Sequence, residues 1–529
     1  MTDAARTSGP DWVRDAVFYQ IFPDRFASSQ RVPKPGPLEP WDTPPTTYGF
    51  KGGDLLGIAE HLDELAELGI TALYLNPVFA SASNHRYHTF DYELVDPLLG
   101  GDAALRELLD AAHARGMRII LDGVFNHASR GFWPFHHVLE NGAASPYRDW
   151  FYLDPEVLAG RRGLVAYPAQ GGPSQPTLGY QAWLDLPALP KLNHSNPAVR
   201  EYLLAVAERW MRFGIDGWRL DVPDEISAPG FWEEFRQRVL AINPEAYLVG
   251  ELWTPSPEWL AGDRFDATMN YPLTEAILSF VGAGRLDGEL VAKTHEYGRM
   301  VRPIDGPEFG RQLERVMALY PEPVASVLLN LLDSHDTPRF LSLARGDKSA
   351  LRLAMLILMS LPGAPCLYYG DEVGMEGLAD PDCRRAYPWD PVRQDAALRA
   401  FVAGLTGLRA AEPVLRHGHF RLLASEGRSV AYGMFGEEGQ GSGVGRTSAG
   451  GRSFVRSFGR SIVVVINAGD QPTRFGFQVP GLAGCLAEQL SWPGRGWSST
   501  FASRKLEGGT VEVELGAREG IAIAFEPSR

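Results

Sequence analysis

The chain has 529 residues, of which 45% are hydrophobic and 22% charged, a composition typical of globular proteins. Its formal net charge of −15 argues against nucleic acid and anionic membranes as partners, because both require a basic surface. The three cysteines, Cys366, Cys383 and Cys485, are too few for a disulfide framework, and the N-terminus has no apolar leader. The longest apolar run, residues 353–361, is too short to cross a bilayer. We therefore expect a cytoplasmic protein.

Strand-like and helix-like segments alternate from residue 16 to residue 415. The first strand is predicted at residues 16–22, and the first helix, which is amphipathic and ends on a glycine, at residues 54–69. Further apolar strands, each followed by a helix, are predicted at residues 70–79, 117–125, 215–222, 246–253, 266–271, 326–334 and 364–372. Eight buried strands in consecutive βα units predict an α/β fold of the (β/α)8 TIM-barrel type. A doubly wound sheet is the competing fold, but the glycine-rich phosphate loop of such sheets is missing.

Two regions depart from this alternation and predict two further domains. Residues 128–194 follow the third strand, are rich in aromatic residues, proline and glycine, and are too long for a simple connection. We predict an inserted domain there, within a barrel domain formed by residues 1–127 and 195–415. Residues 416–529 are predicted to form a C-terminal antiparallel β-sandwich domain, with strands at 419–424, 429–435, 461–469, 473–479, 510–515 and 520–526.

A low-complexity stretch interrupts the predicted C-terminal domain. Residues 436–453 consist largely of glycine and serine, a composition that favours flexible chain over packed structure. We predict a mobile hairpin extension at this place.

Polar and charged side chains follow the aliphatic run of four predicted barrel strands. In TIM barrels the chemistry collects at these carboxyl ends. Each residue alone has an ordinary explanation, such as a helix N-cap or a satisfied core histidine. A coincidence at four strand ends is much harder to explain in that way. The residues are Asp122, Asn126 and His127 after the third strand, Arg219 and Asp221 after the fourth, Glu251 and Trp253 after the fifth, and His335 and Asp336 after the seventh.

This combination suits acid–base chemistry on glycosides. One carboxylate attacks the anomeric carbon, a second acid protonates the leaving oxygen, and the oxocarbenium-like transition state needs negative charge nearby. Arg219 precedes Asp221 by two residues on one strand face, where it can keep that carboxylate ionised. The alternative is a catalytic metal, with imidazoles at residues 84–88 and 135–137. No HExxH-type spacing accompanies them, so no metal site is predicted.

Four segments resemble, in order, the signature segments of the α-amylase family of glycoside hydrolases: DGVFNH (122–127), GWRLDV (217–222), GELW (250–253) and LLDSHD (331–336). The resemblance implies that Asp221 is the nucleophile, that Glu251 is the general acid/base, and that Asp336 stabilises the transition state. It also implies sugar-binding or supporting roles for Tyr87, Asp122, His127, Arg219 and His335. A non-enzymatic scaffold of this family is disfavoured, because such relatives have typically lost these carboxylates.

Three further segments are similar to those of neopullulanases, cyclomaltodextrinases and maltogenic amylases. They are LPKLN (189–193), DVPDE (221–225) and DPDCR (380–384). The similarity implies that Glu225 shapes the acceptor side, that Trp253 is the aromatic residue of the +1/+2 subsites, and that Arg384 contacts sugar. Pro223, Asp224 and His88 depart from the usual residues of this subfamily.

The resemblance implies a retaining hydrolase of α-1,4-glucosidic bonds in maltooligosaccharides, cyclodextrins and related α-glucans, with transglycosylation as a side activity. An α-glucosidase, or a glucan transferase or isomerase on the same scaffold, is the alternative. The predicted first strand starts near residue 16, so we expect the usual N-terminal domain and the swapped dimer built on it to be missing, which leaves the oligomeric state open. Many relatives have a calcium loop after this strand, but residues 27–41 lack its ligand motif. We therefore expect no required cofactor, with a structural calcium ion as the alternative.

Overall fold

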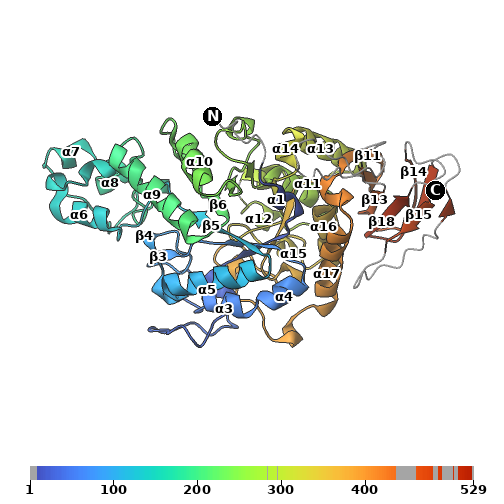
Figure 1. The fold of residues 1–529 in the computed structure, drawn as a ribbon, viewed down its shortest axis with the longest axis horizontal. Coiled ribbons are helices and arrows are strands. Elements are labelled where there is room, and N and C mark those ends of the chain that lie inside the picture. Colours follow the sequence, from blue (N-terminus) through green and yellow to red (C-terminus); the bar gives the residue numbers. More distant parts are fainter. Residues whose placement is uncertain are drawn as a thin grey trace, which may run out of the picture.

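The computed structural model describes residues 9–282, 284–294, 296–436, 460–479, 486–490, 504–505 and 510–526. Its centre is a barrel of eight parallel strands, surrounded by helices (Figure 1). The strands are β1 (Phe18–Ile21), β2 (Ala72–Leu75), β5 (Arg118–Gly123), β6 (Gly217–Leu220), β7 (Tyr247–Gly250), β8 (Ala267–Thr268), β9 (Leu329–Leu331) and β10 (Ala364–Tyr368). Their order is β8-β7-β6-β5-β2-β1-β10-β9, and a parallel bridge between Met269 and Leu329 closes the ring. The predicted TIM barrel is confirmed.

The barrel strands are short and buried, as their apolar sequences require. All four residues of β1, β2, β6 and β7 are buried. Gly217 at the start of β6 permits close contact with β7, since a Cβ atom there would lie 2.1 Å from the Tyr247 carbonyl oxygen. The barrel strands also contain buried polar side chains, among them those of Gln20 in β1, Asp122 in β5 and Arg219 in β6. Buried polar groups need partners, so these three indicate where the barrel interior becomes a polar site.

Helices cover the outside of the barrel. The longer ones are α5 (Gly101–Ala114), α9 (Pro197–Phe213), α10 (Phe231–Ile242), α11 (Tyr271–Val281), α13 (Gly306–Ala318), α16 (Lys348–Ser360) and α17 (Ala396–Ala411). In α9 the local sequence sets both ends: the Asn196 side chain accepts a hydrogen bond from the Ala198 N–H, and Gly214 ends the helix at a φ of 107°. In the part of the chain that the structure describes, no helix has the length and hydropathy needed to cross a membrane.

One predicted helix is divided in two. Residues 54–69 form α3 (Leu55–Glu60) and α4 (Leu62–Glu67), because His61 between them leaves the helical conformation. Its imidazole stacks on Trp389, with ring centroids 3.6 Å apart. This contact comes from a distant loop, so the amphipathic pattern of the segment could not reveal it.

The residues between β5 and α9 extend from one end of the barrel (Figure 1). They contain α6 (Trp133–Asn141), α7 (Pro155–Leu158) and α8 (Ser174–Leu178), and they lie near the hairpin of β3 (Phe79–Ser81) and β4 (Thr89–Val95). Phe135, Phe151 and Tyr180 belong to the same hydrophobic cluster as the barrel strands. An antiparallel β-bridge between His127 and Lys191 joins the end of this segment to the residues that follow β5.

A C-terminal β-domain lies at the opposite end of the molecule (Figure 1). Its strands are β11 (His419–Glu426), β12 (Ser429–Phe435), β13 (Ser461–Asn467), β14 (Thr473–Gln478), β15 (Leu486–Gln489), β16 (Arg504–Lys505), β17 (Thr510–Leu515) and β18 (Glu519–Glu526). A sheet ordered β11-β12-β13-β18-β15-β16 and the pair β14-β17 enclose a separate apolar cluster that includes Phe475, Val511 and Ile523. The predicted antiparallel domain is confirmed, although β15 and β16, which show little alternation, were missed. The predicted hairpin extension lies, from residue 437 on, outside the described residues.

Candidate active site

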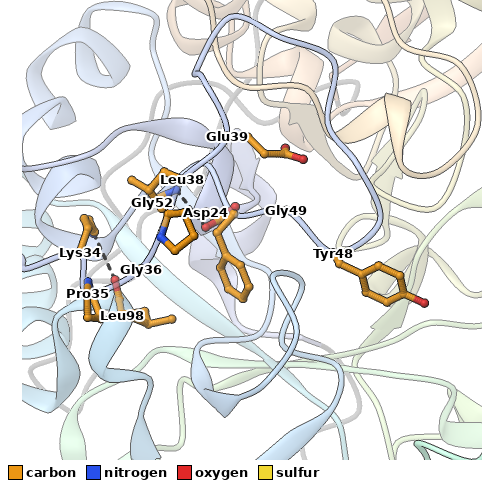
Figure 2. A pocket seen from close by; sticks show the side chains of 12 residues that line it. Asp24, Lys34, Pro35, Gly36, Leu38, Glu39, Tyr48, Gly49, Gly52 and Leu98 are labelled. Carbon is orange, nitrogen blue, oxygen red and sulfur yellow. Dashed lines mark hydrogen bonds between the residues drawn. The ribbon is translucent and has the colours of Figure 1, made fainter.

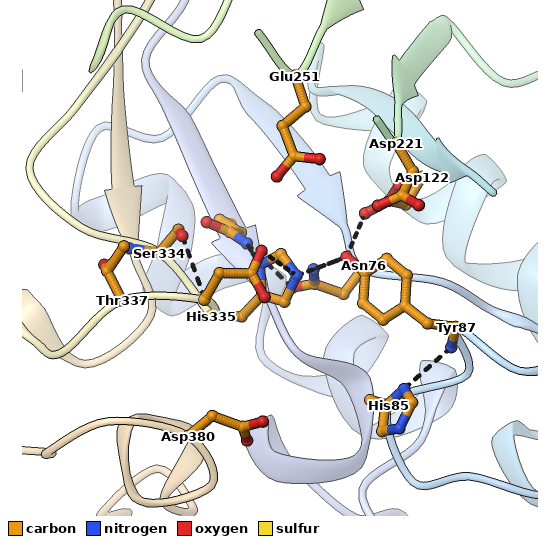
Figure 3. Close-up of polar contacts among 12 residues, drawn as sticks. Asn76, His85, Tyr87, Asp122, Asp221, Glu251, Ser334, His335, Thr337 and Asp380 are labelled. Carbon is orange, nitrogen blue, oxygen red and sulfur yellow. Dashed lines mark hydrogen bonds and ion pairs between the residues drawn. The ribbon is translucent and has the colours of Figure 1, made fainter. Parts of the chain in front are cut away.

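The structure brings the acidic side chains of neighbouring strand ends together at one mouth of the barrel (Figure 3). Asp122 lies in β5 opposite Arg219 in β6, as the parallel register pairs these two residues. Asp221 follows β6 directly, and Glu251 follows β7. All four side chains are buried, which is unusual for charged groups unless they are paired.

Arg219 connects the three carboxylates. Its Nη1 donates to Asp122 Oδ1 at 2.8 Å and to Asp221 Oδ1 at 3.0 Å. Its Nη2 lies 2.6 Å from Glu251 Oε1. The Val222 N–H donates to the other oxygen of Glu251 at 3.1 Å. One guanidinium therefore hydrogen-bonds to Asp122 and Asp221 and forms an ion pair with Glu251, so it contacts both carboxyl groups that the sequence predicts to be catalytic.

Burial and charge separate the protonation states of the two acids. Burial raises the pKa of Asp221 to about 7, against the opposing effect of Arg219 and with support from Asp122 and Asp336. Burial raises the pKa of Glu251 well above its ordinary value, again opposed by Arg219, with the negative charge of Asp221 adding to the shift. Near neutral pH the site can therefore hold one ionised and one protonated carboxyl, which is the pair that acid-assisted nucleophilic substitution needs.

Tyr87 and His335 form a second wall beside these acids (Figure 3). Their rings are parallel, with centroids 5.3 Å apart and an interplanar angle of 2°. The Tyr87 hydroxyl donates to Asp122 Oδ2 at 2.7 Å and lies 2.5 Å from His335 Nε2. His335 Nε2 is also 3.0 Å from Asp336 Oδ2. The third predicted acid is thus linked to Asp122 through a tyrosine and a histidine.

His127 presents a buried polar atom to this region. Its imidazole stacks on Trp183, with centroids 4.9 Å apart, and burial lowers the pKa of His127 to about 3, so the ring is neutral. His127 Nε2 and Asp221 Oδ2 are buried without a hydrogen-bond partner. An unsatisfied buried polar atom is costly, and a bound hydroxyl group would remove this cost.

The remaining predicted residues lie at the margin of the site. Glu225, in the short turn after β6, forms an ion pair with Lys191 at 2.7 Å. Trp253 stacks on Tyr271, with centroids 3.9 Å apart. Arg384 is buried; its Nε donates to the His335 carbonyl oxygen at 2.8 Å and its Nη2 lies 3.3 Å from Asp336 Oδ1. Arg384 therefore holds the loop that carries Asp336.

Sequence reasoning missed four side chains of this arrangement. Tyr74 donates to Asp122 Oδ2 at 2.7 Å, and Asn76 donates to the Tyr87 hydroxyl at 3.1 Å. Gln20 contacts both Asn76 and His335, and Trp183 covers His127. Gln20 and Asn76 could have been found, because each is a polar residue within or at the end of an apolar barrel strand. Trp183 carried no such signal.

The loop after β1 does not fit a bound calcium ion. The Lys51 ammonium is buried there and donates to Pro40 O at 2.6 Å, Thr43 O at 2.8 Å and Thr43 Oγ1 at 2.8 Å. A second ammonium, of Lys34, lies 2.8 Å from the buried carboxylate of Asp54. Oxygen donors that could bind a hard cation are thus paired with lysines. Among the described residues, no group of three or more His, Cys, Asp or Glu side chains is arranged to hold a metal.

A cavity of about 550 Å³ lies beside the same loop (Figure 2). Lys34, Leu38, Tyr48 and Leu98 are among its lining residues, and the lining is mostly apolar. None of the acids and histidines described above lines it. The cavity is therefore separate from the candidate active site.

A TIM barrel whose strand ends can hold one ionised and one protonated carboxyl group, beside stacked aromatic rings, has the architecture of a glycoside hydrolase. The family described as alpha amylase, catalytic domain, matches residues 20–414, and the chain belongs to this family. A cyclomaltodextrinase of Bacillus sp is 44% identical over 427 residues, which are 80% of this chain and 71% of that relative. Neopullulanase 2 of Thermoactinomyces vulgaris is 42% identical over 80% of this chain and 67% of its own length.

Solved structures match almost the whole chain. The native debranching enzyme of Nostoc punctiforme is 40% identical, with a TM-score of 0.83 over 98% of this chain and 99% of that one. The cyclic α-maltosyl-(1→6)-maltose hydrolase of Arthrobacter globiformis is 34% identical, with a TM-score of 0.80 over 98% of this chain and 100% of its own. The fold similarity therefore includes the C-terminal domain as well as the barrel.

Proposed function

We propose that this protein is a retaining glycoside hydrolase that cleaves α-1,4-glucosidic bonds of maltooligosaccharides, cyclodextrins and related α-glucans, with transglycosylation as a side reaction. The single observation that carries the proposal is the contact of one buried arginine, Arg219, with both Asp221 and Glu251. The curated relatives named cyclomaltodextrinase and neopullulanase support the choice of substrate.

The reaction proceeds by double displacement. The Asp221 carboxylate attacks the anomeric carbon while the protonated Glu251 donates its proton to the leaving oxygen, which forms a glycosyl ester and frees one sugar. The Glu251 carboxylate then takes a proton from water, which attacks the ester and releases the second sugar with retained configuration. Asp336 stabilises the positively charged transition state, while Tyr87, His127 and His335 contact the reacting glucose. Attack by a sugar hydroxyl in place of water gives transglycosylation.

Cleavage of α-1,6 bonds is the second candidate. The relatives named debranching enzyme and cyclic α-maltosyl-(1→6)-maltose hydrolase match this chain over nearly their whole length, whereas a solved cyclomaltodextrinase is covered to 79%. Similarity over the complete chain favours a similar shape of substrate cleft. An activity on α-1,6 bonds would use the same two acids, because only the leaving hydroxyl differs.

Product analysis distinguishes these functions. Purified protein would be incubated with maltotriose, β-cyclodextrin, pullulan, panose and maltose, and the products separated by chromatography. We expect maltose and glucose from maltotriose and cyclodextrin, and panose from pullulan when α-1,4 bonds are cleaved. Maltotriose from pullulan would indicate α-1,6 cleavage, and glucose from maltose alone would indicate an α-glucosidase. The absence of new reducing ends on every α-glucan would contradict the proposal.

The two carboxyl groups predict a bell-shaped pH dependence of kcat/KM. Activity should rise as Asp221 ionises, with an apparent pKa of about 7, and fall at higher pH as Glu251 loses its proton. The native Asp221 binds its proton more tightly than an ordinary aspartate of pKa 3.8, so the free energy of unfolding should decrease as pH rises between these values. Initial rates and urea denaturation at a series of pH values measure both effects. An Asp221→Asn variant should lose the corresponding part of the stability change, and equal slopes in the two proteins would contradict the assignment.

We also propose that the enzyme requires no calcium, because Lys51 occupies the oxygen donors of the first loop. EDTA should leave the melting temperature and the activity unchanged. Lys51→Met should lower the free energy of unfolding by about 2 kcal/mol, since it removes a buried ammonium that makes three hydrogen bonds. Lys348→Met removes an exposed ammonium that also pairs with an aspartate, at 2.7 Å, and should have an effect below about 0.5 kcal/mol. A fall in melting temperature with EDTA that calcium reverses would refute the proposal.

We propose a cytoplasmic location. The support is an intracellular maltogenic amylase of Bacillus subtilis, 37% identical over 79% of this chain and 65% of its own length. Fractionation of cells and immunodetection of the protein would test this location.

A further inference from the structure

Gln20 is a buried amide in the otherwise apolar first barrel strand. It is 1% exposed and lies between Phe18 and Ile21, the ends of β1. Its Nε2 is 3.1 Å from Asn76 Oδ1 and 2.9 Å from His335 Nδ1. Burying an amide at the centre of a barrel is costly unless its hydrogen bonds are made, so both contacts are significant. The mechanism above assigns no role to this residue.

The hydrogen-bond network around Tyr87 fixes the direction of each bond. The Asp122 carboxylate accepts from Arg219, from Tyr74 and from Tyr87. The single hydroxyl proton of Tyr87 is thus used, and its oxygen must accept from its other neighbours. These are Asn76 Nδ2, at 3.1 Å, and His335 Nε2, at 2.5 Å (Figure 3). His335 therefore carries a proton on Nε2.

The other nitrogen of the imidazole, Nδ1, faces the Gln20 amide. Asn76 directs its NH2 group to Tyr87, so its carbonyl oxygen faces Gln20 and accepts from Nε2. The remaining N–H of the Gln20 amide points at His335 Nδ1. A proton on Nδ1 would face this N–H with no acceptor between them. The contacts at Nδ1 and those at Nε2 are thus satisfied by the same state of the histidine, which is neutral and protonated on Nε2.

We propose that Gln20 is a positioning residue: its amide donates to His335 Nδ1 and thereby keeps His335 neutral, with its only ring proton on Nε2. This proton is directed to the Tyr87 oxygen and to Asp336 Oδ2, 3.0 Å away. The neutral state is useful because the glycosyl transition state is positively charged. An imidazolium at this place would repel it and would neutralise Asp336 before the reaction begins. The inference rests on the proposed function for its catalytic consequence, but not for the state of the histidine.

Groups from several elements surround His335, and among the titratable ones His85 also interacts with it electrostatically. Gln20 faces Nδ1, whereas Tyr87 and Asp336 face Nε2, and the Tyr87 ring lies parallel to the imidazole. On the backbone side, Arg384 and Cys383 donate to the His335 carbonyl oxygen. Replacing Gln20 by glutamate would therefore place a hydrogen-bond acceptor at Nδ1.

The test compares Gln20→Glu and Gln20→Met with the wild type by nitrogen NMR of histidine-labelled enzyme, with the His335 signals assigned from their loss in His335→Asn. In the wild type, Nε2 should be protonated and Nδ1 unprotonated from mildly acidic to alkaline pH. In Gln20→Glu both nitrogens should be protonated at neutral pH. In Gln20→Met, Tyr87 still accepts from Nε2 but nothing opposes a second proton on Nδ1, so the doubly protonated ring should appear at a higher pH than in the wild type. For both variants kcat should fall by about tenfold or more, the effect of losing one hydrogen bond to a group at the reacting centre, and KM should change less.

Asn330→Asp is the matched control. Asn330 is a buried amide of β9 that donates to Pro362 O and accepts from Asn270, and neither partner is a histidine. This variant should lose stability as Gln20→Glu does, but leave the His335 signals unchanged. A proton on Nδ1 in the wild type, or wild-type ring signals in both Gln20 variants, would overturn the proposal. The spectra require no substrate. Inactivity toward α-glucans would therefore refute the proposed function, while the protonation state of His335 could still be measured.

Discussion

Asp221→Asn should lower kcat/KM by about 10⁴-fold or more, because the amide cannot form the glycosyl ester on which both half-reactions depend. The substitution keeps the shape of the side chain, and Arg219 retains its contacts with Asp122 and Glu251. The fold should therefore persist, which circular dichroism and the melting temperature would verify. Hydrolysis of maltotriose, followed as reducing ends, measures the loss. A variant with wild-type turnover would exclude Asp221 as the nucleophile.

Azide separates the role of Asp221 from that of Glu251. With α-maltosyl fluoride, whose leaving group needs no proton, azide should enter the space left in Asp221→Gly, attack the anomeric carbon from the side of Asp221, expel fluoride and give β-maltosyl azide. In Glu251→Ala the ester on Asp221 still forms, and azide should then displace the carboxylate to give α-maltosyl azide. Opposite configurations in the two variants are expected. The same anomer from both, or the reverse assignment, would contradict the roles proposed here.

Arg219→Met should abolish activity and lower the free energy of unfolding at neutral pH by about 3–5 kcal/mol, because it leaves three buried carboxyl groups without their common cation. The arginine side chain is 0% exposed, and those of Asp122, Asp221 and Glu251 are at most 7% exposed. The pKa values of these acids should rise further once the guanidinium is removed. The loss of stability should therefore shrink in acid, where the carboxyl groups are protonated in both variant and wild type. Urea denaturation at two pH values measures this.

An exposed arginine provides the comparison. Arg212 in α9 pairs with Glu208 at 2.8 Å, but its side chain is 61% exposed. Arg212→Met should change the free energy of unfolding by less than about 0.5 kcal/mol. Arg219→Lys should restore only part of the stability, since one ammonium cannot reproduce the contacts that two guanidinium nitrogens make with three acids. Equal effects of the Arg219 and Arg212 substitutions would show that the central ion pairs contribute little.

The sequence by itself determined the barrel, its strand positions and the acids at its mouth. A strand buried on both faces must be apolar throughout, so the polar residue that ends each run marks the place where the barrel opens. Such places are occupied by Asp122, Asp221, Glu251 and Asp336. These acids can therefore be found from the sequence without the tertiary structure. The alternation of the C-terminal strands is equally local, which is why β15 and β16, with little alternation, were missed.

The tertiary structure alone decided which groups touch. Arg219 was expected to hold Asp221, two residues away, but its contact with Glu251 depends on the packing of β6 beside β7. Likewise, Gln20 meets His335 across 315 positions of sequence, and Lys51 enters a loop whose oxygen donors carry no recognisable spacing. From the local sequence one can predict the preference of each residue for burial and for backbone conformation. The partner of a buried polar group, and hence its protonation state, follows only from the assembled barrel.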